Sequence, residues 1–417
     1  MKDFISQNQA IPIASHHKPD GTPWSIREKF WLGLSVREYR EQFFRNPVNW
    51  VLIIIFAVGV PLLFQRYLFG LHTVTHASND YPWGLFLGFG LFGLVPLSAS
   101  GFLMGLMVEI LGRKDFVPIE RLALLNGLVG YIFAIVYLLV DLGMPWRLYV
   151  PMTISMGPAA VLFLVAWHFA CYLAVQVAEV STAYFEWVGW LKGKRFIKSI
   201  AIGLTIAGIM LSILHQGGLG ALFNYTPTKL HPLWYSAEYS WIHFFSSAIY
   251  GGLGMILISS TLCKNFMAWR CDNRFLASLD DLTIGIGKGA SYALFTYLVI
   301  KLVGVAHDND WPYLLTGWGQ YFLLELGVGA LLPMMMFAVG VKNRRVGLVR
   351  LAGLISVLGL VWNRINTSMI AFNWRLYPEI PHWKEVWLTV TVFAIYFIVY
   401  RFILYRLPIL YEWRGEK

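Results

Sequence analysis

Long apolar stretches separated by short polar ones dominate the chain from about residue 50 onward. Ten of these stretches have about 17 to 25 residues, the length that an α-helix needs to cross the hydrocarbon core of a bilayer. The pattern predicts an all-α polytopic membrane protein. The ten expected transmembrane helices lie near residues 50–69, 83–111, 122–142, 157–178, 197–214, 241–262, 282–305, 319–341, 347–362 and 386–407.

Residues 1–48 precede the first expected span. Residues 11–22 are polar and contain proline, which favours irregular structure. Residues 24–44 interleave aromatic side chains with Arg and Lys, a composition typical of an amphipathic helix in the headgroup region. A partner-binding helix is the alternative. We expect three parts: an N-terminal segment (1–48), a ten-helix domain (49–410) and a short tail (411–417), with no cleavable signal peptide.

Composition and charge agree with a membrane protein. The chain is 57% hydrophobic and 13% charged, and its mean hydropathy is +0.58. The net charge of +10 could indicate a nucleic-acid partner, but 26 of the 33 Lys and Arg residues fall on one side of the expected topology. The positive-inside rule makes that side cytoplasmic. We therefore expect both termini in the cytoplasm and no nucleic-acid partner.

Three cysteines are present without CxxC spacing, which predicts neither an iron–sulfur cluster nor a structural zinc site. Residues 211–223, LSILHQGGLGALF, are the most suggestive stretch. The pattern predicts an apolar helix that ends at His215 and Gln216, followed by glycines that let the backbone approach a flat ligand. We interpret it as the rim of a quinone pocket. Helix capping by these two side chains is the alternative.

Ionisable residues within or beside membrane spans are costly, so each is a candidate for function. The expected quinone-binding residues are Asp141, His215, Gln216, Trp83, His76 and Tyr235. A second polar cluster is expected near the outer ends of later spans, with His243, Lys301, Glu325 and Arg364. A proton path from the cytoplasm is expected to include Glu109, His168, Tyr131 and Tyr137. Structural ion pairs and helix-to-helix hydrogen bonds are the alternatives for individual residues. No metal site is expected.

Several short motifs resemble the NrfD/PsrC family, and more narrowly its ten-span HybB-like branch. They are YPWG at 81–84, DLGMPWRL at 141–148, LHQGGLGALF at 214–223, HPLWY at 231–235 and NRIN at 363–366. The resemblance implies two four-helix bundles, spans 2–5 and 6–9, with spans 1 and 10 peripheral. It also implies a haem-free subunit of the bacterial inner membrane that binds menaquinone near the periplasmic face.

The resemblance further implies partners: a periplasmic iron–sulfur subunit, with a molybdopterin-family-like or multihaem cytochrome c subunit beyond it. We expect electron exchange with menaquinone, reduction being favoured, and possible proton transfer across the membrane. No haem or iron–sulfur cluster is expected in this chain, and lipid is its other partner. A quinol-oxidising or hydrogenase-linked HybB-type subunit is the alternative. A secondary transporter fits less well, because transporters place their polar site near the midplane of repeated halves.

Overall fold

The structure, a computed structural model, describes residue 22, residues 24–376 and residues 380–411. Residues 11–21, where we expected irregular structure, lie outside this part of the chain. The described residues contain ten helices that are long and apolar enough to cross a membrane, and each overlaps one expected stretch. No β-strand occurs among them, apart from an isolated bridge between Leu230 and Phe372. The prediction of an all-α, multi-pass membrane protein is confirmed.

The ten spans follow one another along the chain; five are single helices, and the other five consist of two or more helical segments. They are α4 (Pro47–Phe69); η2 (Phe86–Leu91), α5 (Leu94–Leu97), α6 (Ser100–Gly105) and η3 (Leu106–Ile110); η4 (Lys114–Phe116) and α7 (Val117–Asp141); α9 (Val161–Val188); α11 (Ala201–Ala221) and η6 (Leu222–Tyr225); α12 (Ser240–Phe266); α13 (Asn273–His307); α14 (Gly317–Leu326), η10 (Gly327–Leu331) and α15 (Leu332–Lys342); α16 (Val346–Ile365) and η11 (Asn366–Ile370); and α17 (Trp383–Arg406). Shorter elements lie between the spans: α2 (Ile26–Trp31), α3 (Val36–Arg45), η1 (Leu71–Thr73), η5 (Pro145–Arg147), α8 (Val150–Thr153), α10 (Leu191–Ser199), η7 (Pro232–Trp234), η8 (Ala268–Arg270) and η9 (Trp311–Leu315).

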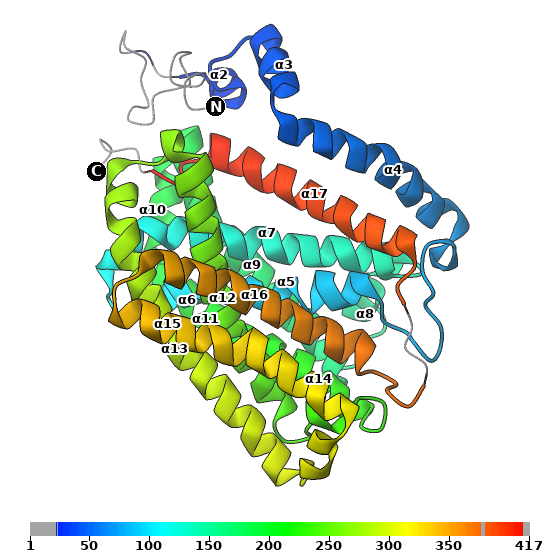
Figure 1. Cartoon of the computed structure of the whole chain (residues 1–417). Coiled ribbons are helices and arrows are strands. Elements are labelled where there is room, and N and C mark those ends of the chain that lie inside the picture. The colour runs from blue at the N-terminus through cyan, green and yellow to red at the C-terminus, as the bar shows by residue number, and fades with distance from the viewer. Residues whose placement is uncertain (1–21, 23, 377–379, 412–417) are drawn as a thin grey trace.

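The first and last spans run side by side in opposite directions, as the ribbon shows (Figure 1). Arg401 Nη2 donates to Asn49 Oδ1 at 2.7 Å near one end, and Lys384 Nζ donates to Gln65 Oε1 at 3.4 Å near the other. We call the end where α4 begins and α17 ends the termini end, and the opposite end the far end. Expected orientation places the termini end in the cytoplasm.

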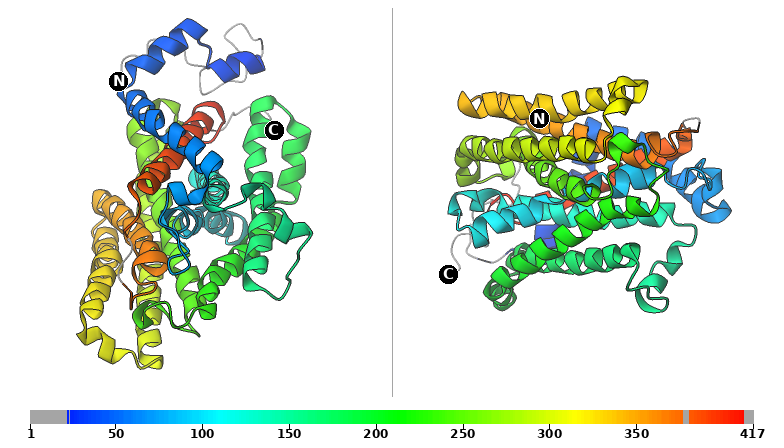
Figure 2. Two further views of the ribbon diagram at one scale, coloured as in Figure 1. Left: turned by 90° about the vertical axis from the view of Figure 1, so that its right-hand side faces the viewer. Right: turned by 90° about the horizontal axis from the view of Figure 1, so that it is seen from below.

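Burial differs sharply between spans. The span from Phe86 to Ile110 and helix α12 are the most buried, at 83% and 72% of their most apolar windows, whereas α4 is only 22% buried. Helix α12 contacts α11, α13 and α16 as well as α5 and α6, so it lies at the centre of the helix assembly (Figure 2). The most apolar helix, α4, therefore presents most of its side chains to lipid. The grouping into two four-helix bundles stays a prediction.

Four π-helical turns interrupt the spans: η2, η3, η10 and η11. Turns of this kind are frequent at functional sites, because the extra residue re-aims the side chains beyond it. The turns η2 and η11 contact each other. A Cβ on Gly88 would lie 2.7 Å from Ser368 Oγ, so glycine is needed for this close approach.

Residues 24–45 form two helices, α2 and α3, where the sequence predicted one. Leu32 and Gly33 have positive φ angles of 56° and 73°, which end α2. Ser25 and Ser35 then each start a helix with a capping box. Expecting one continuous helix was wrong because the residues after Trp31 form this left-handed turn, and Ser35 supplies a new N-cap.

Candidate functional site

A hollow at the far end brings together ionisable and aromatic side chains from four parts of the chain. It has a volume of about 420 Å³, counting its open mouth. We call it the far-end pocket. Its wall includes His76, Trp83 and Gly84 from the connection between α4 and η2 (residues 70–85), which we call the first outer connection. Asp141 from α7, Met369 from η11 and Glu385 from α17 complete it on the other sides. Three of the six predicted quinone-binding residues, His76, Trp83 and Asp141, thus line one pocket.

Asp141 is the last residue of α7, so its position depends on what holds this end of the helix. Arg66 of α4 holds this helix end in place: its Nε donates to the carbonyl of Val140 at 2.5 Å, and its Nη2 donates to the carbonyl of Leu142. Arg66 is only 2% exposed. The guanidinium therefore satisfies main-chain carbonyls that a helix C-terminus leaves without partners. It also places one positive charge beside the Asp141 carboxyl.

Glu385 is the acidic residue that the sequence reasoning missed. It lies in the first turn of α17, is buried, and accepts a hydrogen bond from the Leu85 N–H at 2.5 Å. Gly84 makes room for it, because a Cβ there would collide with Glu385 Oε1. The expected outer connection ran to residue 385, so Glu385 was counted as part of a loop. An acidic residue at the start of an apolar span was the available signal.

His76 lines the pocket and contacts a second histidine, His382. The rings of His76 and His382 are 4.9 Å apart at their centroids in an edge-to-face arrangement. His76 Nδ1 lies 3.2 Å from the carbonyl of Ile380, and His382 Nδ1 accepts from the Lys384 N–H at 3.1 Å as the N-cap of α17. Partial burial, the neighbouring His76 and Lys384 lower the pKa of His382, so the imidazole stays neutral and able to accept.

Trp83 connects the pocket to an aromatic layer behind it. Its ring lies 5.0 Å from that of Phe372 and 5.5 Å from that of Phe223, which in turn contacts Phe92 and Phe244. This layer separates the pocket from the interior of the helix assembly. Tyr235 is not in the pocket wall; it is half-buried in the connection before α12.

His215 and Gln216 lie deeper than expected. The predicted helix end at His215 is wrong, because α11 continues to Ala221. The glycines pack helices closely: a Cβ on Gly220 would collide with the carbonyl oxygen of Ser240, and one on Gly218 would lie 2.5 Å from Val165 Cγ2. Phe223, which touches Trp83, follows His215 by eight residues, about 12 Å along a helix. His215 is therefore about two turns below the aromatic layer.

His215 belongs to a buried group with Tyr131 and Tyr172. The Tyr131 hydroxyl hydrogen-bonds Nε2 of His215, and His215 Nδ1 lies 2.6 Å from the carbonyl of Leu211. A neutral imidazole with its proton on Nδ1 satisfies both contacts. Gln216 Nε2 donates to the carbonyl of Val95 at 3.0 Å. We call His215, Gln216, Tyr131 and Tyr172 the buried tyrosine group.

This group continues toward the termini end through polar side chains. Gln176 Nε2 donates to the Tyr172 hydroxyl at 2.9 Å and lies 3.5 Å from Glu179 Oε2. The charges of Glu109, Glu120 and Glu179 interact with one another at the inner end of this route. Of the expected proton-path residues, Tyr131 and Glu109 thus lie along one polar route. Glu179, Gln176 and Tyr172 were missed, although their spacing of three and four residues on α9 was a readable signal.

The other two expected proton-path residues lie elsewhere. Tyr137 donates to the carbonyl of Thr389 at 2.7 Å, which joins α7 to α17. His168 is half-buried on α9, and its buried Nδ1 has no hydrogen-bond partner among the described residues. It interacts electrostatically with His215. Tyr137 therefore contacts the main chain of another span, and His168 borders the buried tyrosine group.

The expected second cluster is one compact buried network around Glu325. Its carboxylate accepts from Trp234 Nε1 at 2.7 Å, from Asn363 Nδ2 at 2.6 Å and from Asn366 Nδ2. Arg364 donates to Asn363 Oδ1 and stacks 3.7 Å from the ring centroid of Phe244. We call this the Glu325 network.

Two further cluster residues border this network. Lys301 and His243 are both buried on adjacent helices. The charge of Lys301 interacts with those of Glu325, Arg364 and His243. The structure thus brings His243, Lys301, Glu325 and Arg364 together, while Lys301 and Glu325 make no direct salt bridge within the described residues.

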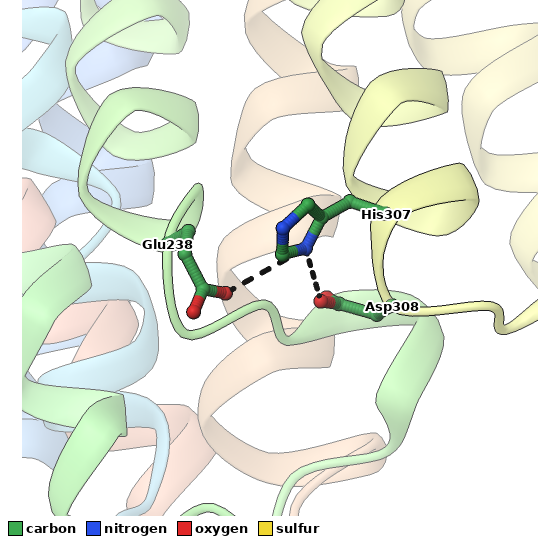
Figure 3. A group of neighbouring side chains, drawn as sticks. All are labelled: Glu238, His307 and Asp308. Atoms are coloured by element: carbon green, nitrogen blue, oxygen red, sulfur yellow. Dashed lines mark hydrogen bonds and ion pairs between the residues drawn. The ribbon is translucent and has the colours of Figure 1, made fainter.

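A third group lies on the far-end surface (Figure 3). His307 Nδ1 lies 2.9 Å from Asp308 Oδ1 and 3.8 Å from Glu238 Oε2. One nitrogen or oxygen atom from each of the three side chains, of the kind that can bind a metal ion, lies within 4.8 Å of the other two. The side chains of Glu238 and His307 are 57% and 49% exposed. Ion pairs this exposed are common on protein surfaces and contribute little to stability. We assign this group as a surface ion pair.

Comparisons with known proteins place this geometry in context. The model of the family described as polysulphide reductase, NrfD matches residues 73–371. A protein of Nitratidesulfovibrio vulgaris is 38% identical over 88% of this chain and 95% of its own length. The probable Ni/Fe-hydrogenase 2 b-type cytochrome subunit of Escherichia coli is 24% identical over 84% and 88% of the two chains. The menaquinone reductase integral membrane subunit of N. vulgaris is 22% identical over 94% of each.

Proposed function

Because the chain belongs to the NrfD family, we propose that it is the quinone-interacting membrane subunit of a respiratory oxidoreductase complex. Two of its relatives are named as subunits of redox enzymes: one as a probable Ni/Fe-hydrogenase 2 b-type cytochrome subunit and one as a menaquinone reductase integral membrane subunit. The observation that supports this proposal best is the far-end pocket, where two carboxyl groups, a histidine and a tryptophan line one hollow. We propose menaquinone as the substrate, with no haem or iron–sulfur cluster in this chain.

The chemistry of quinone reduction fits this set of residues. Each quinone takes up two electrons and two protons, so the site needs proton donors near the carbonyl oxygens. Asp141 and Glu385 supply carboxyl groups that exchange protons, and His76 supplies an imidazole. Trp83 offers a flat apolar face. The site is at a membrane helix end, where a lipid-soluble substrate and an external electron partner can both approach.

We propose that electrons come from a partner at the far end, an iron–sulfur subunit with a molybdopterin-family-like or multihaem cytochrome c subunit beyond it. The far end is then periplasmic, both termini are cytoplasmic, and the membrane is the bacterial inner membrane. The name of one relative favours menaquinone reduction, and that of another favours a hydrogenase-linked role. Identification of the co-purifying subunits decides between these two: a multihaem cytochrome c supports the first, and a nickel–iron hydrogenase the second.

The name of the Escherichia coli relative includes a b-type cytochrome, so the fit of a haem can be tested on the histidines. A b-type haem needs axial imidazole nitrogens that point into a shared space. Both ring nitrogens of His215 already have partners, Tyr131 and the carbonyl of Leu211. His243 Nε2 lies 3.3 Å from the carbonyl of Ile300. His215 therefore does not fit an axial haem ligand, whereas the buried nitrogens His168 Nδ1, His231 Nε2 and His243 Nδ1 have no hydrogen-bond partner among the described residues. We propose that the chain binds no haem, and a purified chain with a stoichiometric haem absorbance would contradict this.

We propose that the buried tyrosine group, with Gln176, Glu179 and Glu109, transfers protons from the termini end toward the pocket. Each proton that crosses the membrane is worth about 2.3 kcal/mol per 100 mV. Turnover in liposomes, with an electron donor on the far-end side, should then generate a membrane potential. Tyr131→Phe keeps the ring but removes the hydroxyl, so we expect the potential to fall while quinone still binds. An unchanged potential would show that protons do not pass through Tyr131.

The direct test of the proposed function is quinone binding by the purified full chain. A short-chain naphthoquinone with a photoreactive group should label peptides from the first outer connection, the end of α7 and the start of α17. Excess unlabelled menaquinone analogue should prevent this labelling. Labelling confined to peptides around the Glu325 network would instead place the quinone site in the later spans.

A further inference from the structure

A second hollow lies at the termini end, between the connection at residues 113–116 and the first turns of α13. Its volume is about 720 Å³, counting its open mouth. The α13 wall consists of residues four, three, one and three positions apart, which places them on one helix face. They are Arg274, Ser278, Asp281, Leu282 and Gly285. We call this hollow the basic groove.

The charges of the groove are unevenly compensated. Arg113 donates to both oxygens of Asp115, at 3.0 and 2.8 Å, and Asp281 is paired with Arg344 from outside the groove. Lys114 Nζ reaches only a main-chain carbonyl, that of Val108, at 3.3 Å. Arg274 makes no hydrogen bond or ion pair with any described residue. Two cations with free donors therefore line the groove, and neither is hydrogen-bonded to a carboxylate of the groove wall; Lys114 interacts only electrostatically with Glu120, outside the groove.

Polarity changes along the groove. Arg274 and Ser278 are at its outer end, whereas Leu282 and Gly285 lie about 12 and 16 Å farther along α13 from Arg274, at 1.5 Å per residue. The buried ring of Phe116 faces the inner part, and a Cβ on Gly285 would lie 3.1 Å from Phe116 Cζ. The ring packs closely against Gly285, which is exposed, so the glycine and the ring edge form an apolar surface at this end of the groove.

The position of the groove matches the headgroup layer. Helix α13 has 35 residues and is thus about 52 Å long, whereas the hydrocarbon core is about 30 Å thick. Its first turns extend beyond the hydrocarbon at the termini end. Cations at this level, followed along α13 by the apolar surface of Phe116 and Gly285, are arranged in the same order as the phosphate and acyl chain of a phospholipid.

We propose that the basic groove binds an anionic phospholipid, with its phosphate between Lys114 and Arg274 and an acyl chain over Gly285 and Leu282. Guanidinium and ammonium groups bind phosphate oxygens through charge-assisted hydrogen bonds. A net negative headgroup is favoured because neither Lys114 nor Arg274 is paired with a carboxylate of the groove wall. This site is separate from the far-end pocket and does not depend on the proposed quinone function.

The test measures lipid binding by the detergent-solubilised full chain, using native mass spectrometry with phosphatidylglycerol and phosphatidylcholine. The double variant Lys114→Gln, Arg274→Gln should bind phosphatidylglycerol about 25-fold more weakly, since each cation contributes about fivefold. Gly285→Leu should weaken binding about tenfold by placing a bulky side chain where the acyl chain is proposed to lie, roughly the effect of two buried methylene groups lost from the contact.

Matched controls separate the site from general effects. Arg195→Gln removes another exposed arginine at the termini end, and Gly289→Leu changes the next exposed glycine on α13, where a Cβ meets only ordinary contact. Both controls should retain wild-type affinity, and thermal unfolding of all variants checks folding. Equal affinity of wild type for the two lipids, or full affinity of the double variant, would overturn the proposal.

Inorganic phosphate provides the last arm of the experiment. A lipid site should not lose phosphatidylglycerol to millimolar phosphate, because the acyl contacts contribute to lipid binding alone. Competition by phosphate together with no effect of Gly285→Leu would overturn the lipid assignment in favour of a free-anion site.

Discussion

Two buried carboxyl groups at the far end, Glu385 and Glu325, differ in what surrounds them. The Glu325 carboxylate accepts hydrogen bonds from one tryptophan and two asparagine side chains and lies beside two buried cations, Lys301 and Arg364. Glu385 accepts from a main-chain N–H and lines an open hollow together with a second carboxyl group, Asp141.

The charges around the two groups differ. Those that act on Asp141 come from one carboxyl group, Glu385, and one cation, Arg66. Around Glu325, one carboxylate serves two cations. The far-end pocket thus holds two carboxyl groups in an open hollow, whereas three donors and two cations surround the single Glu325 carboxylate. We therefore propose proton exchange for the far-end pocket and a structural role for the Glu325 network.

The largest expected effect comes from Asp141→Asn. The amide keeps the shape of the side chain but cannot release a proton, so quinone turnover of the assembled complex should fall about 100-fold. Complex assembly should be unaffected, as measured by co-purification of the partner subunits. Glu238→Gln, an exposed change at the same end, is the matched control and should retain normal turnover.

A normal rate in Asp141→Asn would remove the distinction between the two regions. The quinone site would then be sought around the Glu325 network, the other far-end group of buried ionisable residues. Glu385→Gln tests whether the two carboxyl groups of the pocket act together. If they act as a unit, this variant should lose about as much turnover as Asp141→Asn, and the double variant should lose no more than either single variant.

The sequence was sufficient for the helices but not for the depth of every residue. Apolar length alone predicted ten spans because each crossing must satisfy its own backbone hydrogen bonds. The glycines after His215 were ambiguous, since glycine both ends helices and allows close helix packing. The structure shows packing at Gly218 and Gly220. Because α11 continues past His215, this residue lies about two helical turns farther from the pocket than the sequence predicted.

Only part of the pocket wall could be predicted from the sequence, because one of its residues comes from a span that is distant along the chain. Asp141, His76 and Trp83 were expected from motifs near span ends, and they line one hollow. Glu385 comes from the tenth span, beyond the family match that ends at residue 371. The resemblance implied that this span is peripheral. Only the antiparallel contact between α4 and α17 brings the start of α17 to Gly84, and no local sequence pattern encodes that pairing.

A smaller effect is expected from Glu325→Gln, in stability and not in turnover. Removal of the carboxylate charge leaves Lys301 and Arg364 buried without an anion, and the new amide N–H groups face existing donors. The free energy of unfolding should fall by about 3 kcal/mol, seen as a lower thermal midpoint in detergent. The rate per folded complex should remain within about twofold of wild type. A stable variant without quinone turnover would reverse the two assignments.

The smallest expected effect concerns His382, which caps the helix that positions Glu385. Its neutral Nδ1 accepts the Lys384 N–H, so protonation removes the cap. Because burial lowers the pKa of His382, the stabilisation is complete above the usual value of 6.5 and is lost as pH falls through the lower folded-state pKa. The cap is worth about 1 kcal/mol.

Hydrogen exchange of the first α17 amides should therefore accelerate from pH 7 to pH 5, after correction for intrinsic rates. His382→Asn retains a capping oxygen that does not titrate and should show no such change, whereas His382→Ala should exchange faster at every pH. Equal pH dependence in wild type and His382→Asn would show that another group, such as one in the pocket itself, controls this helix end.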